Sequence, residues 1–519
     1  MTYSEELLQL SNEELGKQMY RMFADCEQVQ RRVLREILDS AKDTEIGRKY
    51  HFAETESVEE YTDKIPLSAW DDYEPYVELM KNGESDILFK DKAVFFTISA
   101  GTTSPRCKYI PDSRMSVVVR TLIGKMRMLQ YFMAEPTLMK GLIMPLVSMP
   151  ETETTAAGIR CGYASGLTFT QSEAKDRIAF PLSLFAIKDS AERDYRMMVE
   201  AIARRNVSVL AGNNASRMTT LARMAQKRRD DIIRDIAARD GERAEELRAL
   251  KAFTPATYWP ELKLGLFWLS ASVGKTVEEL LPLLPKSIKL MDVGYGSSEA
   301  KFNIPLKPGE TSGALSTATA FYEFIPEGGG RPLMAHQTEA GRNYELVVTT
   351  WGGLYRYEMK DVVRVTGFVG NTPMIEFQYK SIEVLNMVDE KLPATVVNEL
   401  VRKFFLERGI AIRQLQIYLN EREKRYDVYI EPTERRLPAD GQTVSELDSM
   451  LARQLTGYNL FRNELHMLQE LTVTEMKQGW QEWLYDKASR SAGMTNGQMK
   501  LSLIAKEPAG KEFTCHCSR

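Results

Sequence analysis

Apolar residues recur at helical spacing near the start of the chain. Leu8, Leu15, Met19 and Phe23 are separated by seven or four positions, with polar residues between most of them. Such spacing places them along one face of a helix. The run Ser11–Glu14 has the form of a capping box, in which a serine and a later glutamate each bond the other's backbone amide. The pattern predicts a helical N-terminal region.

Short apolar runs alternate with longer helical patterns beyond this region. The run 207–210 is strand-like, and a helical pattern extends from about residue 215 to 250. Alternation of this kind predicts a parallel sheet flanked by helices. Between Lys227 and Arg248 both charge signs mix with spaced Ile, Ala and Leu. This mixture favours a solvated helix face over the alternative of a binding surface.

Closely spaced strand patterns begin at about Ala320. Aromatic, aliphatic and β-branched residues dominate the runs 321–325, 344–348 and 362–365. Runs of this kind predict a β-barrel or an antiparallel sheet. This part of the chain is therefore expected to differ from the parallel sheet that precedes it.

A separate small pattern follows residues 378–381. Its expected helices are 396–406 and 445–455, and its expected strands are 413–419 and 426–431. We therefore expect an α/β protein whose large N-terminal domain, residues 1–379, contains flanked β-sheets and a β-barrel-like part. Residues 380–519 are expected to form a small, mobile α+β C-terminal domain.

Length and composition are typical of a folded protein with more than one domain. A chain of 519 residues exceeds the size at which a single hydrophobic core stops growing. Hydrophobic residues make up 43% and charged residues 27%, which argues against wholesale disorder. The formal charge of -4, from 68 basic and 72 acidic residues, provides no overall attraction for nucleic acid.

The sequence shows no membrane or secretory signal. No apolar run approaches the ~20 residues needed to span a bilayer, so no membrane span is expected. The acidic start lacks the basic and apolar regions of a secretory signal. The five cysteines are odd in number and mostly scattered, which does not suggest a disulfide framework. These features indicate a reducing, cytoplasmic location.

A loop rich in serine and threonine follows the strand-like run 93–98. The loop consists of Ser99, Ala100, Gly101, Thr102 and Thr103, and Lys108 lies five positions after it. Glycine lets a backbone approach an anion closely, and hydroxyls, amides and a nearby cation can bind phosphate oxygens. The loop is therefore a candidate phosphate site. A purely structural turn is the common alternative for such a segment.

A second candidate segment, Tyr295-Gly296-Ser297-Ser298-Glu299, follows the predicted strand 288–293. Proteins of the α/β class bind ligands at the carboxyl ends of their strands. The tyrosine ring could stack on a base, the hydroxyls could hold phosphate or carboxylate, and the glutamate could ligate Mg²⁺ beside phosphates. The structural alternative is the capped start of a helix.

A third candidate is Asp361, which is expected directly before the strand 362–365. A carboxylate at this position could accept hydrogen bonds from both ribose hydroxyls of a nucleotide. The structural alternative is a turn aspartate that pairs with Arg356 or Arg364.

Other patterns carry less information. The run 273–276 has the end of a P-loop, but Leu269 stands where the first glycine is required. Ser272 and Lys275 fit a Ser-x-x-Lys hydrolase pattern at only two positions. The run 515–517, Cys-His-Cys, has metal-ligating atoms, but adjacent residues rarely close a tetrahedral shell alone. We expect it to be a disordered tail.

The order and spacing of the three candidate segments resemble the adenylate-forming superfamily. Within it, the chain is most similar to the auxin-responsive acyl-acid amido synthetases of the Gretchen Hagen family. That family has a Ser/Thr-Ser-Gly-Thr-Thr loop followed by a lysine and Ile-Pro, and a Tyr-x-x-Ser-Glu element. Further similar phrases extend over nearly the whole chain, at residues 43–50, 259–260, 322–326, 354–357, 361–368, 390–391, 426–431 and 498–500.

The resemblance implies an ATP and Mg²⁺ site. By the family's pattern, residues 99–103 and Lys108 would hold the phosphates. Residues 295–299 would lie at the adenine side and the metal, with Glu299 as the metal ligand.

The same resemblance implies roles for later residues. Asp361 would bind the ribose, Arg364 of the same motif would belong to the ATP site, and Lys391 would contact the nucleotide. Lys500 would reach the reacting carboxylate and the α-phosphate. Glu299 and Lys500 are therefore the expected catalytic residues.

The implied activity is a two-step ligation. ATP would adenylate a small carboxylic acid, and the acyl group would pass to an amino acid or another amine, with release of AMP and pyrophosphate. The alternatives are an acyl-CoA synthetase with a thiol acceptor and a non-catalytic nucleotide-binding homologue. The chain departs from the family's pattern at Ser104-Pro105, at Asp389, and at Met359-Lys360, where an aliphatic-glycine pair is usual.

Overall fold

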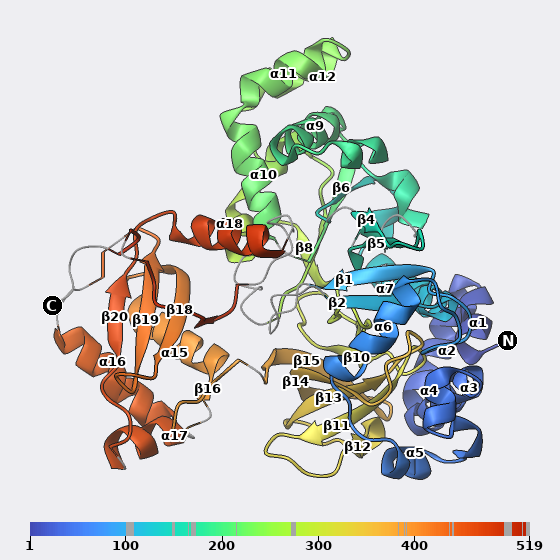
Figure 1. Ribbon diagram of the computed structural model, residues 1–519. Helices are drawn as coiled ribbons and strands as arrows, with labels where there is room; N and C mark the ends of the chain where they lie inside the picture. Colours follow the sequence, from blue (N-terminus) through green and yellow to red (C-terminus); the bar gives the residue numbers. More distant parts are fainter. Residues whose placement is uncertain are drawn as a thin grey trace. The chain divides into compact units, whose positions relative to one another are not determined.

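The computed structural model describes most of the chain and divides it into two compact units (Figure 1). The first unit contains residues 1–99 and 108–378, and the second begins at Tyr379. The mobile role expected for the smaller domain stays a prediction. The description omits residues 100–107, 148–150, 165, 168–172, 214, 271–276, 382, 389, 391, 435, 438–440, 465, 493–500, 511 and 515–519.

The N-terminal region is helical, as predicted. The Ser11 hydroxyl accepts from the Glu14 amide at 3.3 Å, and the Glu14 carboxylate accepts from the Ser11 amide at 3.0 Å, which confirms the capping box. The buried Gln30 amide group donates to the carbonyls of Thr317 and Ala320, which ties the region to the antiparallel sheet. The helices are α1 (Tyr3–Gln9), α2 (Asn12–Ala24), α3 (Cys26–Ala41), α4 (Glu45–Lys49), α5 (Val58–Lys64) and α6 (Glu74–Lys81).

A parallel sheet with the strand order β3-β6-β7-β8 confirms the prediction from the alternating pattern. Its strands are β3 (Leu142–Pro145), β6 (Val207–Ala211), β7 (Leu264–Phe267) and β8 (Lys289–Asp292). Met198, Ile202, Leu221 and Leu210 belong to the apolar core between this sheet and its helices. The chain therefore leaves β8 at the carboxyl edge of a parallel sheet, as expected.

The helical pattern from about residue 215 to 250 forms three helices rather than one. Ile232, Ile233 and Ile236 are buried, while Arg234 and Glu242 are exposed. This matches the solvated face that the sequence favours. The helices of this region are α7 (Arg114–Ala134), α9 (Ser190–Ala203), α10 (Ser216–Lys227), α11 (Arg229–Ala237), α12 (Gly241–Ala249) and α13 (Pro255–Tyr258).

Two further sheets complete the first unit. A small sheet has the order β2-β1-β5-β4, and a larger one has the order β12-β11-β13-β14-β15-β10-β9, with antiparallel pairing from β12 through β14. The antiparallel alternative is therefore the one observed. The strands are β1 (Phe95–Ser99), β2 (Lys108–Asp112), β4 (Glu153–Thr154), β5 (Arg160–Gly162), β9 (Asn303–Pro305), β10 (Gly313–Leu315), β11 (Phe321–Pro326), β12 (Leu333–Met334), β13 (Asn343–Thr349), β14 (Tyr357–Val369) and β15 (Thr372–Lys380).

The position expected for Asp361 is wrong. It was expected directly before a strand, but it lies inside β14, which begins at Tyr357. Lys360 has a φ of 55° within this strand, and the β13–β14 register shifts between Glu345 and Val347. The strand predicted from the sequence, 362–365, began only after this irregularity, because the alternation of side chains is broken there.

The second unit is a mixed four-stranded sheet with helices. Val401 and Phe405 of its first helix pack with Leu447 and Leu451 of its second and with Ile417 of the sheet. The sheet order is β20-β19-β18-β21. The elements are β16 (Val384–Leu385), β17 (Leu392–Pro393), α15 (Ala394–Leu406), β18 (Ile412–Asn420), β19 (Arg425–Pro432), α16 (Gly441–Gln454), α17 (Thr456–Asn459), β20 (Thr472–Glu475), α18 (Trp480–Ala492) and β21 (Ile504–Ala505).

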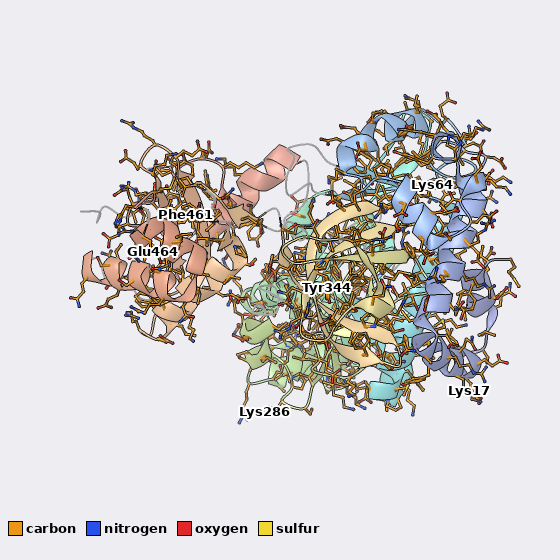
Figure 2. All side chains as sticks on the ribbon, turned by 90° about the horizontal axis from the view of Figure 1, so that it is seen from below. Lys17, Lys64, Lys286, Tyr344, Phe461 and Glu464 are labelled. Carbon is orange, nitrogen blue, oxygen red and sulfur yellow. The ribbon has the colours of Figure 1, made fainter. Side chains whose placement is uncertain are left out.

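Side chains separate into core and surface in the usual way. In Figure 2, Tyr344 lies among the side chains of the antiparallel sheet, whereas Lys17 and Lys286 lie at the rim of the first unit. Cys26 and Cys161 are buried free thiols. Across the described residues, no helix has both the length and the apolar character that crossing a membrane requires.

Candidate active site

A tight hairpin follows the carboxyl end of β8. Gly296 and Lys301 form an antiparallel bridge, and between them the Ser297 amide donates to the Ala300 carbonyl at 2.9 Å. The Glu299 amide donates to the Ser297 hydroxyl at 3.2 Å. No helix begins in residues 295–301, so the capped helix start considered from the sequence is wrong.

Arg127 of α7 holds the backbone of this hairpin. Its Nη2 donates to the carbonyls of Tyr295 at 3.2 Å and Asn303 at 2.6 Å. A Cβ added to Gly294 would lie 2.4 Å from this nitrogen, and Gly294 has a φ of 83°. Glycine is therefore required at this position for both space and backbone conformation.

The hydroxyl of Tyr295 contacts the carboxylate of Asp361. The tyrosine donates this hydrogen bond to Oδ2, and the two side chains are 3% exposed each. The Tyr295 ring packs against Phe302 and Phe377, with centroid distances of 4.5 and 5.3 Å. Burial and then the charge of Asp361 raise the pKa of Tyr295, so the phenol stays protonated. Stacking of this ring on a base stays a prediction and would require the ring to become accessible.

A second tyrosine links β14 to β1 and β2, the strands on either side of the candidate phosphate loop. Ser99 and Lys108 are paired residues in the β1–β2 ladder, and Lys108 Nζ donates to the Tyr357 hydroxyl at 3.3 Å. Burial, followed by the charges of Glu299 and Asp361, raises the pKa of Tyr357. These contacts and charges bring parts of all three candidate segments of the sequence into one region.

A pocket lies beside the hairpin, within the first unit. Its cavity volume is about 40 Å³, and the wider space around it is open to solvent. Its walls come from the end of β2, from α7, and from residues 297–301, 319–320 and 350–352. The serines and the glutamate of the second candidate segment therefore face the same space as α7.

One ion pair and one further cation line this pocket. Arg120 Nη2 contacts Asp112 Oδ1 at 2.5 Å, and the Thr97 hydroxyl donates to the other Asp112 oxygen at 2.9 Å. Lys301 Nζ donates to the Ser297 carbonyl at 3.3 Å. Burial is the main cause that lowers the pKa of Lys301, to about 7, and the nearby charges of Arg127 and Arg120 lower it further.

Three buried polar atoms belonging to the pocket lining have no hydrogen-bond partner among the described residues. They are Nη1 of Arg120, Oγ1 of Thr350 and Nε1 of Trp351. The Ser113 hydroxyl donates to the Trp351 carbonyl at 2.7 Å, so the segment around Trp351 is fixed against the start of α7. Buried polar atoms without partners cost about 1–3 kcal/mol each and often indicate a water, ion or ligand site.

The structural alternative for Asp361, pairing with Arg356 or Arg364, receives no support. Arg356 pairs with Glu323 at 2.7 Å and also donates to the carbonyls of Thr62 and Ile65. Arg364 is exposed. Side chains three positions apart in a strand point to opposite faces, so the structure does not bring Arg364 to the pocket. Its assignment to the ATP site stays a prediction.

The lysine at the unusual Met359-Lys360 pair adopts a backbone conformation typical of glycine. Its φ of 55° is in the left-handed region, where a side chain costs roughly 1–2 kcal/mol. Lys360 Nζ contacts Glu358 at 2.8 Å and Glu345 at 3.1 Å. The backbone beside Asp361 therefore keeps a conformation that glycine would favour, although the residue is lysine.

Several predicted site residues lie outside the described residues, namely Gly101, Thr102, Thr103, Lys391 and Lys500. The hydrolase and P-loop patterns at 271–276 and the Cys-His-Cys run also lie there. Their assignments stay predictions.

Glu390, which directly precedes Lys391 in the sequence, anchors a turn of the second unit. Its carboxylate accepts from the amides of Met387 and Val388 at 2.7 Å each and from the hydroxyl of Tyr426. It is 4% exposed. This arrangement favours a structural role for Glu390 in fixing the backbone next to Lys391.

The hairpin is chemically suited to Mg²⁺ held together with a nucleotide. Glu299 lines the pocket beside the hydroxyls of Ser297 and Ser298. Among the described residues, no three His, Cys, Asp or Glu side chains form a cluster that could hold a metal ion. Mg²⁺ is commonly bound by one or two carboxylates plus phosphate oxygens, so one glutamate fits a metal that arrives with ATP.

Sequence reasoning missed Arg120, Arg127 and Lys301. Arg120 and Arg127 are seven positions apart, a spacing that places both on one face of a helix. That signal was available in the sequence. Lys301 follows the second candidate segment by two residues, but only the hairpin reveals that its side chain turns back toward Ser297.

Comparison with known proteins identifies clear relatives. Residues 15–287 match the GH3 family N-terminal domain, and residues 313–380 match the GH3 family central domain. The indole-3-acetic acid-amido synthetase GH3.4 of Arabidopsis thaliana is 24% identical over 442 residues, covering 75% of this chain and 73% of that protein. The 4-substituted benzoates-glutamate ligase GH3.12 of the same plant is 23% identical, with 73% coverage of each.

Solved structures share the fold. The AtGH3.15 acyl acid amido synthetase in complex with 2,4-DB has a TM-score of 0.80 and 19% identity, covering 97% of this chain and 96% of that chain. A 2-hydroxyisobutyryl-CoA ligase in an open conformation has a TM-score of 0.52 and 10% identity, covering 91% and 90%. The fold is therefore that of adenylate-forming ligases.

Proposed function

The chain belongs to the GH3 family, and from this premise we propose which of its residues carry out the reaction. The protein is an acyl-acid amido synthetase, because its relatives are named as such and share its fold. It is an ATP-dependent ligase that adenylates a carboxylic acid and transfers the acyl group to an amine, with release of AMP and pyrophosphate.

The reaction needs activation before transfer. A carboxylate is a poor acyl donor because its leaving group would be oxide. Attack of the carboxylate oxygen on the α-phosphorus of ATP breaks the bond to pyrophosphate and gives an acyl-adenylate. An amine then attacks the acyl carbon, AMP leaves, and the amine nitrogen gives up one proton. The first step brings two anions together, so the site must supply positive charge.

The nucleotide is proposed to bind at the Tyr295–Asp361 contact. The buried Tyr295 hydroxyl holds one oxygen of the Asp361 carboxylate, which fixes the orientation of the carboxylate for the ribose hydroxyls. Ser99 and Lys108, paired across β1 and β2, are proposed to flank the phosphates with the loop between them. Mg²⁺ bound by Glu299 and the phosphate oxygens would neutralise charge on ATP.

The pocket beside the hairpin is proposed to bind the carboxylic acid. It shares the wall 297–299 with the proposed nucleotide site and continues along α7 to Val119 and Ile123. An acid that occupies it would place its carboxylate beside the hairpin and its carbon skeleton against α7. The relatives named for indole-3-acetic acid and for substituted benzoates support a small acid of this general kind, with an amino acid as the acceptor.

Lys500 is proposed to complete the adenylation site. A lysine near the C-terminus could neutralise the charge that develops on the α-phosphate, and loss of one such group typically costs about 10²–10³ in rate. Lys500→Ala should therefore lose adenylation to this extent. Lys506→Ala, a nearby exposed lysine, serves as the matched control and should keep normal adenylation.

The observation that carries the proposal is that Tyr295 contacts Asp361, while Glu299 of the same hairpin lines the pocket. The test is ATP–pyrophosphate exchange over a panel of aryl and aliphatic acids, followed by trapping with hydroxylamine. Acid-dependent exchange and hydroxamate formation are expected. ATP binding without exchange for any acid would favour a non-catalytic homologue.

A thiol acceptor is the second candidate, since an acyl-CoA synthetase shares the fold. The first step would be unchanged, and only the acceptor would differ. Supplying CoA and a mixture of amino acids to the same acyl-adenylate separates the two functions. The amide product is expected. Exclusive formation of acyl-CoA would show that the protein is an acyl-CoA synthetase instead.

A further inference from the structure

The side chain of Lys301 occupies a place made for it by the hairpin. A Cβ on Gly296 would lie 2.5 Å from Lys301 Cδ and 3.3 Å from its Nζ. The lysine therefore crosses directly over Gly296 and ends at the Ser297 carbonyl, 3.3 Å away. Its ammonium group is consequently held at the pocket wall that contains Ser297, Ser298 and Glu299.

This ammonium is not paired with a carboxylate among the described residues. Its one hydrogen bond goes to a carbonyl oxygen, which leaves two N–H donors for another group. Arg120, the other cation in the pocket lining, is already bound to Asp112. Arg127 donates to the carbonyls of the hairpin. Lys301 is therefore the cation with spare donors at the hairpin wall.

The rest of the pocket also contains hydrogen-bond donors that have no acceptor. Nη1 of Arg120 and Nε1 of Trp351 are buried donors without partners in the described part of the chain. Both are fixed in place, Arg120 by Asp112 and the Trp351 backbone by the Ser113 hydroxyl. A pocket with several spare donors favours a ligand with acceptor oxygens, and a carboxylate offers about four acceptor sites.

We propose that Lys301 binds the carboxylate of the acid substrate, so that the reacting group enters the pocket as an ion pair with this ammonium. The proposal rests on the assignment of the pocket to the acid. It makes Lys301 a substrate-binding residue of the first half-reaction. The acid is bound as a carboxylate and not as a neutral ester, amide or protonated acid.

Charge-assisted hydrogen bonds of this type are short and about twice as strong as neutral ones. Without a bound carboxylate, the half-buried ammonium has lost part of its water and gained only a carbonyl. With a carboxylate, it regains a charged partner in a site of low dielectric. Binding of the acid therefore relieves an unfavourable charge, and the affinity gained is specific to anionic ligands.

The test compares four proteins by pyrophosphate exchange, using the most active acid from the panel. They are the wild type, Lys301→Met, Lys301→Arg and Lys307→Met, an exposed lysine outside the pocket that serves as the control. The KM values for the acid and for ATP are measured at one pH for all four proteins. Thermal unfolding first establishes that each variant is folded.

Lys301→Met should raise the KM for the acid by about 10–100-fold, as expected for loss of a hydrogen bond to a charged group. The KM for ATP should stay unchanged, and Lys307→Met should resemble the wild type. Arginine keeps the positive charge, so Lys301→Arg should keep most of the affinity for the acid that Lys301→Met loses.

Three results would overturn the proposal. One is an unchanged KM for the acid in Lys301→Met, and another is a raised KM for ATP instead, which would assign the lysine to the nucleotide. If Lys301→Met does not fold, Lys301→Gln replaces it, and an unchanged KM for the acid in that variant would contradict the proposal. Failure of the proposed function looks different, because then no acid supports exchange in the wild type.

Discussion

Arg356 and Lys301 are two cations of the same unit, the first buried and the second half-buried, and their surroundings are opposite. Arg356 is 5% exposed and is neutralised by Glu323 at 2.7 Å, with two carbonyls accepting from the same guanidinium. Lys301 has a single carbonyl and a pKa lowered to about 7. The comparison teaches that a buried charge with complete partners stabilises the fold, whereas one with spare donors is available for a ligand.

The largest effect is expected from breaking the paired cation. Glu323→Gln would leave Arg356 buried without a charged partner, and removal of one member of a buried pair costs about 3–5 kcal/mol. The free energy of unfolding, measured with urea, should fall by this amount.

Two controls make this prediction specific. Glu339→Gln removes the partner of the exposed Arg342 and should change stability by less than about 1 kcal/mol. The double variant Glu323→Leu with Arg356→Met should recover much of the loss, since apolar replacement of a buried pair is often neutral. A loss in the Glu339→Gln variant equal to that of Glu323→Gln would contradict the distinction.

The next effect concerns a buried anion instead of a cation. Tyr295→Phe would remove a hydrogen bond to the buried Asp361 carboxylate, which should cost about 1.5–3 kcal/mol of stability. The KM for ATP should rise as well, because the orientation of Asp361 for the ribose is lost. Urea unfolding and exchange kinetics measure the two effects.

Tyr344→Phe is the matched control for this variant. Tyr344 is equally buried in β13, but its hydroxyl accepts from the neutral Glu339 amide at 2.9 Å. Its removal should cost about 0.5–1.5 kcal/mol and leave the KM for ATP unchanged. A normal KM for ATP in Tyr295→Phe would remove the reason to place the ribose at Asp361.

The third prediction tests the unpaired cation through stability alone. The folded pKa of Lys301, about 7, lies below the unfolded value of roughly 10.4. Between these values the unfolded chain binds more protons, so this residue makes the protein more stable as pH rises and less stable as pH falls toward 7. The slope for one proton is at most about 1.4 kcal/mol per pH unit.

The difference between Lys301→Met and the wild type isolates this residue from other titrating groups. At pH 7 the variant should be at least as stable as the wild type, and the advantage should shrink toward pH 9. Urea unfolding at several pH values measures it. A variant that is much less stable than the wild type at pH 7 would show that Lys301, like Arg356, is structural.

The smallest effect is expected at Lys360. Lys360→Gly would relieve a left-handed backbone conformation that costs roughly 1–2 kcal/mol, while the partly exposed contacts with Glu345 and Glu358 contribute about 0–1 kcal/mol. Stability should therefore stay constant or rise slightly. Lys360→Ala keeps the backbone cost and loses the contacts, so it should be less stable than Lys360→Gly. The reverse order would contradict this account.

The sequence was informative where local pattern decides the structure. The N-terminal capping box, the parallel strands before residue 293 and the antiparallel strands after 320 were predicted because their periodicity is regular. Asp361 was misplaced because Lys360 interrupts that periodicity inside β14. The family resemblance indicated the hairpin as a candidate site, although the residues alone were equally consistent with a helix start.

Contacts between distant segments could not be read from the chain. The bond between Tyr295 and Asp361 joins positions 66 residues apart, and no local pattern reports it. The same holds for the ion pair of Arg356, which forms with Glu323 and not with Asp361. Among the described residues no carboxylate pairs with Lys301, and this depends on where α7 and β2 place their own charges, so it required the fold.

The most direct test of the central claim is the chemical identity of the final product. The wild-type protein would be incubated with the best acid, ATP, Mg²⁺, a mixture of amino acids and CoA, and the products resolved by mass spectrometry. The account predicts an N-acyl amino acid, with AMP and pyrophosphate formed in equal amounts. Formation of acyl-CoA alone, or consumption of ATP without any acyl product, would contradict it.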